Sequence, residues 1–125
     1  MPVVPPPAVE SALDAVGNTP VVRLCRVVPE GHAQVFVKLE YFNPTGSYKD
    51  RMAKSMVEEA ERRGDLKPGM TVVEASGGST GSSLAFVCAV KGYGFQVATS
   101  NAFAIEKLRT MRPSARCAPS ARPST

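Results

Sequence analysis

The sequence predicts an α/β fold, a mostly parallel sheet with flanking helices. Segments typical of strands alternate with segments typical of helices along the chain, and this order favours parallel pairing. A glycine-rich stretch, Ser76–Gly81, lies between an apolar strand and an apolar helix. The length of 125 residues and the hydrophobic content of 43% suit one modest domain with a core of its own.

The first half of the chain predicts a short helix and two strands. Ser11–Val16 is the helix, with Ser11 as its N-cap. The strands are Val21–Val27 and Val35–Tyr41, and Pro29–His32 forms a loop between them. The proline-rich residues 1–7 are expected to be extended and disordered.

A long helix is predicted over Ser47–Arg63. Ser47 and Asp50 have the spacing of a capping box, with Asp in place of the usual Glu or Gln. Gly64 is the expected C-cap. Apolar side chains recur on one side of the helix, which predicts a core face made of Met52, Met56, Val57 and Ala60.

The second half of the chain repeats the order of strand and helix. Met70–Ala75 predicts a strand that is buried over Val72–Ala75. Ser82–Lys91 predicts an apolar helix that ends at Gly92. Phe95–Thr99 predicts a further strand, which completes an alternation of the kind that parallel sheets require.

The stretch Asn43–Arg51 places a lysine just inside the start of the long helix. Lys49 falls in the first helical turn, next to a turn marked by Asn-Pro and Thr-Gly. A lysine held at a fixed position can form a Schiff base with a carbonyl cofactor. Taken alone, a helix lysine is far more often a solvated side chain. Asn43 is expected to shape the turn, and Asp50 and Arg51 to make helix-start and packing contacts.

The glycine-rich loop Ser76–Gly81 gives Lys49 a candidate partner. A strand, a glycine-rich loop and a helix in that order present backbone N–H groups to an anion. The hydroxyl groups of Ser76, Ser79 and Thr80 add donors that can also accept. A plain strand-to-helix turn with a serine cap is the alternative. A nucleotide-binding P-loop is excluded because the loop lacks the Gly-Lys-Ser/Thr ending.

Together these features resemble the fold-type-II pyridoxal-phosphate enzymes, with cysteine synthase and cystathionine β-synthase as the closest look-alikes. The lysine motif and the glycine-rich loop occur in the family's order, after a segment that looks like its N-terminal Gly-Asn-Thr-Pro motif. The resemblance implies that residues 8–112 are the N-terminal portion of a domain of this family. The segments that carry it are Val16–Leu24, Asn43–Arg51, Ser76–Gly81, Leu84–Tyr93 and Glu106–Arg112.

The resemblance implies pyridoxal 5'-phosphate as the cofactor and Lys49 as the catalytic residue that binds it. The common cysteine synthase loop has an asparagine, which contacts the cofactor's phenolic oxygen, where this chain has Ser79. Serine is shorter and offers one donor, and Ser79 is assigned to cofactor binding by that match. The loop as a whole is implied to bind the carboxylate of the substrate through Ser76, Gly77, Gly78, Ser79, Thr80 and Gly81.

The reaction implied by the resemblance is β-replacement or β-elimination on a small amino acid. O-acetylserine or serine would lose its β-substituent, and addition of sulfide would make cysteine. Threonine synthase and the serine-threonine dehydratases share variants of the lysine motif, so the substrate stays open. The parent enzyme is expected to be a homodimer.

The composition changes at Pro113. The tail Pro113–Thr125 has no apolar periodicity and nearly repeats Pro-Ser-Ala-Arg, so it is expected to be disordered. A last helix, Ala102–Arg112, is predicted before it. In the family the chain continues into a second glycine-rich loop for the cofactor phosphate. We therefore expect a truncated fragment of a longer enzyme, inactive on its own; a catalytically incompetent remnant is the alternative.

Composition argues against several other classes of protein. The net charge of +4 is spread among acidic residues, with no basic face carrying aromatic side chains, which argues against nucleic-acid binding. Cys25, Cys88 and Cys117 are too scattered for a metal site or a disulfide framework, and Cys88 is expected in the core. The longest apolar run, Leu84–Val90, is too short to span a bilayer. A soluble cytoplasmic protein, reduced at its cysteines, is expected.

Overall fold

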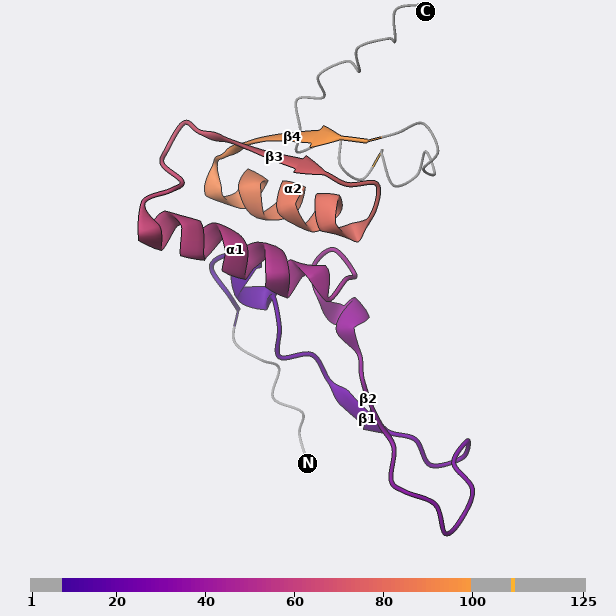
Figure 1. Cartoon of the computed structure of the whole chain (residues 1–125). Helices are drawn as coiled ribbons and strands as arrows, with labels where there is room; N and C mark the ends of the chain where they lie inside the picture. The colour runs from indigo at the N-terminus through magenta and orange to yellow at the C-terminus, as the bar shows by residue number, and fades with distance from the viewer. Residues whose placement is uncertain (1–7, 100–108, 110–125) are drawn as a thin grey trace, which may run out of the picture.

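The computed structural model describes residues 8–99 and residue 109 (Figure 1). The expected disorder of residues 1–7 and 113–125 and the predicted helix Ala102–Arg112 therefore lie outside the described residues, apart from Arg109. The elements in chain order are η1 (Ala12–Ala15), β1 (Val21–Arg23), β2 (Phe36–Lys38), η2 (Glu40–Phe42), α1 (Lys49–Arg63), β3 (Thr71–Ala75), α2 (Ser79–Lys91) and β4 (Gly94–Ala98), where η marks a 3-10 helix.

The body of the molecule is three layers deep. Helix α1 packs along α2, and α2 packs against the strand pair β3–β4 (Figure 1). The two strands are parallel and in register from Thr71 opposite Gly94 to Ala75 opposite Ala98, with α2 as the crossover between them. The predicted α/β fold is confirmed in this β3–α2–β4 unit. Both α1 and α2 begin at the same end of the body (Figure 1).

A second strand pair projects from the body. Strands β1 and β2 pair antiparallel, from Val21 opposite Lys38 to Arg23 opposite Phe36, and form a ribbon with every residue exposed (Figure 1). Each strand has three residues, so the predicted strands Val21–Val27 and Val35–Tyr41 were too long. The second strand stops because the chain coils into η2 immediately afterwards. Strands joined by a short loop pair antiparallel, so among the described residues only β3 and β4 are parallel.

The core is made of small and medium apolar side chains between the two helices and the sheet. Helix α1 buries Asp50, Ala53 and Val57, which follow the helical repeat on one face. Met56 is 52% exposed, so the prediction that it belongs to the core is wrong; it falls on the neighbouring face of the helix. The buried apolar residues are Leu13, Ala53, Val57, Leu84, Ala85, Val87, Cys88 and Phe95.

Strand β3 is half-buried rather than buried. Val72 packs against the core, but Val73 is 65% exposed, so the predicted buried strand Val72–Ala75 is wrong. The pattern alternates because α2 covers one face of the strand pair within the described residues. Cys88 lies in the core as predicted, and burial raises the pKa of its thiol to about 11.

The helix ends explain where the elements start and stop. Gly64 and Gly92 end α1 and α2 in the left-handed conformation, each with φ of 79°, as predicted. Ser11 caps η1 in a capping box with Asp14. At the other end of the helices, the Glu61 carboxylate accepts from Lys91 Nζ at 2.7 Å and from the Tyr93 hydroxyl at 2.8 Å, which fastens α1 to α2.

Candidate functional site

Lys49 is the first residue of α1 and is half-buried. Its Nζ lies 4.7 Å from the centre of the Tyr48 ring, within the range of a cation–π contact. Its backbone N–H donates to the Ser47 hydroxyl at 3.1 Å. Among the described residues no carboxylate forms an ion pair with the amine. The amine is therefore held beside an aromatic face without being tied to an acid.

The predicted capping box at the start of α1 is wrong. The helix begins at Lys49, two residues later than expected, and Tyr48 takes the N-cap position without a side-chain hydrogen bond. The Asp50 side chain does not return to the Ser47 backbone. It points into the protein, where it accepts hydrogen bonds from Thr45 and Ser83.

Asp50 is fully buried and joins the lysine turn to α2. Its carboxylate accepts from the Thr45 N–H at 2.7 Å, from the Thr45 hydroxyl, and from the Ser83 hydroxyl at 2.6 Å. Thr45 belongs to the turn before α1, and Ser83 lies on the buried face of α2, two residues after Gly81. The residue next to Lys49 is thus bonded directly to the helix that follows the glycine-rich loop.

A second polar cluster fixes the turn from the other side. Asn43 is buried; its Oδ1 accepts from the Gly17 N–H at 2.9 Å, and its Nδ2 donates to the Glu40 carbonyl at 2.7 Å and to Glu40 Oε2 at 2.9 Å. Arg51 donates to the two oxygens of Glu40 at 2.9 and 3.0 Å. The Thr19 hydroxyl donates to Glu40 Oε1 at 2.7 Å. Asn43 therefore shapes the turn as expected, and Arg51 and Asp50 make the packing contacts expected of them.

Charge and backbone geometry both favour this cluster. Hydrogen bonds from Arg51 and Thr19, with a smaller one from Asn43, lower the pKa of Glu40 to about 2. The same ion pair raises the pKa of Arg51. Gly17 has φ of +97°, and a Cβ there would lie 2.9 Å from the Arg51 guanidinium. The Gly-Asn-Thr-Pro segment is therefore an anchor for the turn that carries the lysine.

The glycine-rich loop is shorter than predicted, because α2 starts at Ser79 rather than at Ser82. The Ser76 hydroxyl accepts from the N–H groups of Gly78 and Gly81 at 3.3 and 3.1 Å, so it caps the helix. Within the part of the chain that the structure describes, the N–H groups of Gly77, Ser79 and Thr80 have no acceptor. The first N–H groups of a helix have no intrahelical partner, and such groups bind anions.

The loop also has room beside it. A Cβ added at Gly78 would meet nothing within 4 Å, so the backbone there is open to an approaching group. Ser79 is exposed and Thr80 is half-buried. The starts of the two adjoining helices thus carry the Lys49 amine, open backbone N–H donors and the hydroxyl groups of Ser79 and Thr80. This donor set fits an aldehyde cofactor and a carboxylate.

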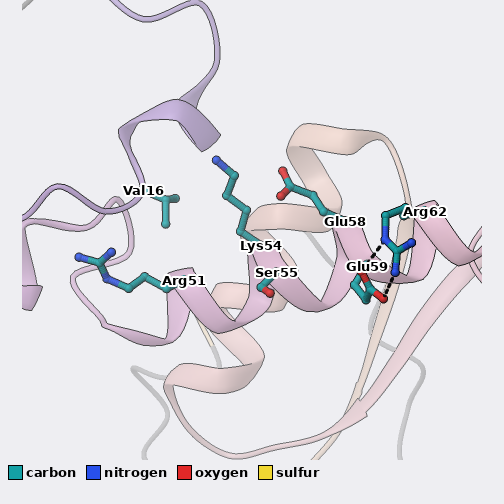
Figure 2. Close-up of a pocket in the computed structure, with 7 residues that line it drawn as sticks. All are labelled: Val16, Arg51, Lys54, Ser55, Glu58, Glu59 and Arg62. Carbon is teal, nitrogen blue, oxygen red and sulfur yellow. Dashed lines mark hydrogen bonds and ion pairs between the residues drawn. The ribbon is translucent and has the colours of Figure 1, made fainter.

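One groove lined by described residues lies away from this donor set. Figure 2 shows an open groove of about 520 Å³ on the outer face of α1. Lys49 and the glycine-rich loop do not line it, and its cations are already engaged: Arg51 with Glu40, Lys54 with the Leu13 carbonyl at 3.0 Å, and Arg62 with Glu59. Its lining residues are Val16, Arg51, Lys54, Ser55, Glu58, Glu59 and Arg62.

His32 and Lys38 have ordinary surroundings. His32 is exposed in the loop between β1 and β2, where its Nδ1 lies 3.3 Å from the Glu30 carbonyl. Lys38 Nζ donates to the Thr19 carbonyl at 3.1 Å. Residues 8–99 and 109 contain no group of three or more His, Cys, Asp or Glu side chains that could hold a metal ion. None of the helices described is long and apolar enough to cross a membrane.

The sequence did not single out Ser83, Thr45 or Glu40. Ser83 carries the clearest signal that could have found it: it is a polar residue on the face of an apolar helix that also holds Leu84 and Val87. A hydroxyl on such a face needs a partner inside the protein. The partner itself could not be read from the pattern, because Asp50 has the spacing of a capping residue.

Comparisons with known proteins agree with the geometry. The chain is 56% identical over 85 residues to a cysteine synthase of Staphylococcus aureus (strain N315), covering 68% of this chain and 27% of that protein. It is 47% identical over 106 residues to the O-ureido-L-serine synthase of Streptomyces lavendulae, covering 85% of this chain and 32% of that protein. The chain thus spans about a third or less of the length of these relatives.

Solved structures match the fold. The crystal structure of O-ureido-L-serine synthase superposes with a TM-score of 0.82 at 44% identity, over 90% of this chain and 36% of that one. Cysteine synthase (OASS) from Entamoeba histolytica gives a TM-score of 0.84 at 32% identity, over 94% of this chain and 37% of that one. The fold-type-II resemblance is confirmed. A model of the family described as "Pyridoxal-phosphate dependent enzyme" matches residues 12–114, and the chain belongs to that family.

Proposed function

We propose that this chain is the lysine-bearing part of an enzyme of the cysteine synthase type, which carries out β-replacement on a small amino acid. In this proposal Lys49 holds pyridoxal phosphate, and the loop from Ser76 to Gly81 holds the substrate carboxylate. The bond between Asp50 and Ser83 is the observation that carries the proposal, since it joins the first turn of α1 to α2.

Pyridoxal phosphate, when bound, would draw electrons from the α-carbon of an amino acid, so that the substituent on the β-carbon can leave. The residues of this chain would do the rest. Lys49 Nζ would hold the cofactor and, once free, take the proton from the α-carbon. The first turn of α1 restricts where the amine can reach, which is the entropic part of its contribution.

The start of α2 would bind and orient the substrate. The N–H groups of Ser79 and Thr80 and the positive end of the helix favour a carboxylate. The Thr80 hydroxyl would add a donor. Ser79 would face the cofactor oxygen with a single hydroxyl, and Gly77 and Gly78 would leave room for the ligand. Ser76 and Gly81 contribute by shaping the loop, because they bond to each other.

O-acetylserine or serine is the substrate that the cysteine synthase relatives support, and a substrate of the threonine synthase or dehydratase type is the alternative. A homodimeric parent enzyme and a cytoplasmic location belong to the same proposal. Among the described residues the cysteines Cys25 and Cys88 are free thiols, which fits a reducing compartment. The competing proposal is that the chain is a remnant without catalytic activity. It is supported by the small share of the relatives' length that the chain covers.

Covalent attachment of the cofactor separates the two proposals. The full chain would be incubated with pyridoxal phosphate, reduced with borohydride, and digested for peptide mapping. We expect saturable labelling at Lys49, lost in Lys49→Ala. The control is Lys67→Ala, which removes an exposed lysine from a loop and should label like wild type. Labelling spread evenly over the six lysines of the chain would contradict the proposal and favour the remnant.

A further inference from the structure

We propose that Asp50 is a positioning residue, whose buried carboxylate sets the spacing between Lys49 and the loop from Ser76 to Gly81. The inference rests on the proposed function, because it assigns a purpose to the bond between Asp50 and Ser83 in terms of the site that these two segments would form.

The contacts of Asp50 form a closed triangle. Its Oδ1 accepts from Ser83 Oγ at 2.6 Å and from the Thr45 hydroxyl, and its Oδ2 accepts from the Thr45 N–H at 2.7 Å. The Thr45 and Ser83 hydroxyl oxygens lie 3.3 Å apart. Asp50 and Ser83 have no exposed surface. Three segments, the turn, α1 and α2, therefore meet at one carboxylate.

Packing between the helices does not by itself require this carboxylate. Ala53 and Val57 are buried along the same face of α1 and give the apolar contact with α2. No cation forms an ion pair with Asp50 among the described residues, so neutral donors alone offset its loss of water. Burying a charge in this way is costly, and an apolar residue of similar size often stabilises a fold as well. Hydrogen bonds differ from apolar contacts in fixing direction.

The direction matters because Asp50 follows Lys49 in the same helical turn. Successive side chains on a helix point about 100° apart. Once Asp50 is fixed toward Ser83, the rotation of the helix fixes the direction in which the Lys49 side chain leaves the backbone. Ser83 in turn lies on the helix whose first residues are Ser79 and Thr80. One carboxylate thus sets both the rotation of the lysine and its distance from the open N–H groups.

The test compares cofactor labelling of Lys49 in four variants. Ser83→Ala removes the α2 end of the bridge, and Asp50→Ala removes its centre. Asp50→Asn keeps an acceptor for the Thr45 N–H, while its amide can donate to the two hydroxyls. Ser55→Ala, on the exposed face of α1, is the matched control. Circular dichroism would confirm that each variant keeps its helices.

If the bridge holds the lysine in place, its loss lowers the fraction of chains competent for attachment. The pyridoxal phosphate concentration at half-saturation of Lys49 should rise about tenfold in Ser83→Ala, and further in Asp50→Ala. Asp50→Asn should recover most of the loss, and Ser55→Ala should match wild type. Half-saturation in Ser83→Ala equal to that in Ser55→Ala would overturn the inference.

Hydrogen exchange gives a readout that does not need the cofactor. The Thr45 amide should exchange about tenfold faster in Ser83→Ala and Asp50→Ala, with the amide of Val87 unchanged. Unchanged exchange at Thr45 would overturn the inference whatever the labelling gives. Faster exchange with unchanged labelling would also overturn it, since Asp50 would then be only a structural tie. A wild type without preference for Lys49 would instead overturn the proposed function.

Discussion

The turn before α1 and the turn before α2 differ in how far their polar groups are hydrogen-bonded within the protein. In the first turn, Asn43 accepts from the Gly17 N–H, and the Thr45 N–H donates to Asp50 of α1. Asp50 in turn accepts from Ser83 of α2. In the second, only the Ser76 hydroxyl caps the helix, and several N–H groups have no acceptor within the described residues. The difference indicates a division of work: the first turn holds a reactive side chain still, and the second is open to receive a ligand.

The largest loss of stability should come from replacing Gly17, which anchors the turn before α1. Gly17→Ala places a side chain at a φ of +97° and 2.9 Å from the Arg51 guanidinium. We expect the free energy of unfolding to fall by about 1–3 kcal/mol, measured by urea unfolding.

Gly31→Ala is the matched control for this change. Gly31 also has a positive φ, +81°, but no atom lies within 4 Å of an added Cβ. Both variants carry backbone strain, so the excess loss in Gly17→Ala reports the contact with Arg51. Equal losses in the two variants would show that the anchor does not depend on this close approach.

The ion pair of the first turn should make stability depend on pH. The pKa of Glu40 is about 2 in the folded chain, below its ordinary value of 4.5. A lowered pKa means that the contribution of the carboxylate is complete above about pH 4.5 and is lost as the pH falls through about 2. Glu40→Gln should be less stable than wild type near neutral pH, and the two should converge in acid.

Urea midpoints measured across that acid range would test this dependence. Glu58→Gln serves as the control, because Glu58 is exposed on α1 and makes no ion pair among the described residues. A gap between wild type and Glu40→Gln that stays constant down to about pH 2 would contradict the assignment of the lowered pKa.

Predictions from the sequence were reliable where a single local rule decides the structure. Gly64 and Gly92 end their helices because glycine tolerates a positive φ, and Ser11 caps η1 through its own side chain. Local rules failed where two partners compete. Asp50 has the spacing of a capping residue, but Thr45 and Ser83 offer it more donors in the interior.

Burial was harder to predict than element type for the same reason. Met56 and Val73 are apolar members of correctly placed elements, yet both are exposed. Their elements have one covered face each within the described residues, and the sequence does not show which neighbour covers which face. The order of the candidate site residues could be read from the sequence, whereas their connection through a buried carboxylate could not.

A smaller effect is expected from the cap of the second turn. Ser76→Ala removes the acceptor for the N–H groups of Gly78 and Gly81. Loss of a helix cap costs about 1 kcal/mol, so thermal unfolding should shift down slightly. Ser79→Ala, which removes an exposed hydroxyl without a described partner, should leave stability unchanged. Equal shifts in both variants would contradict the capping role of Ser76.

The smallest effect on stability should come from Thr80. Thr80→Val keeps the shape of the side chain and removes a hydroxyl that has no described partner, so the free energy of unfolding should change by less than about 0.5 kcal/mol. Binding of an amino-acid carboxylate to the cofactor-loaded chain should nevertheless weaken. A large loss of stability would show that Thr80 belongs to the fold rather than to the open donors of α2.

The central claim is that the amine of Lys49 and the open N–H groups of α2 form one site. The most direct measurement is the amide NMR spectrum of the chain, titrated with pyridoxal phosphate. We predict that the signals of Ser79 and Thr80 shift saturably in wild type, and that the cofactor concentration at half of the shift rises about tenfold in Lys49→Ala. The same half-shift concentration in both proteins, or no shift at these residues in wild type, would contradict the claim.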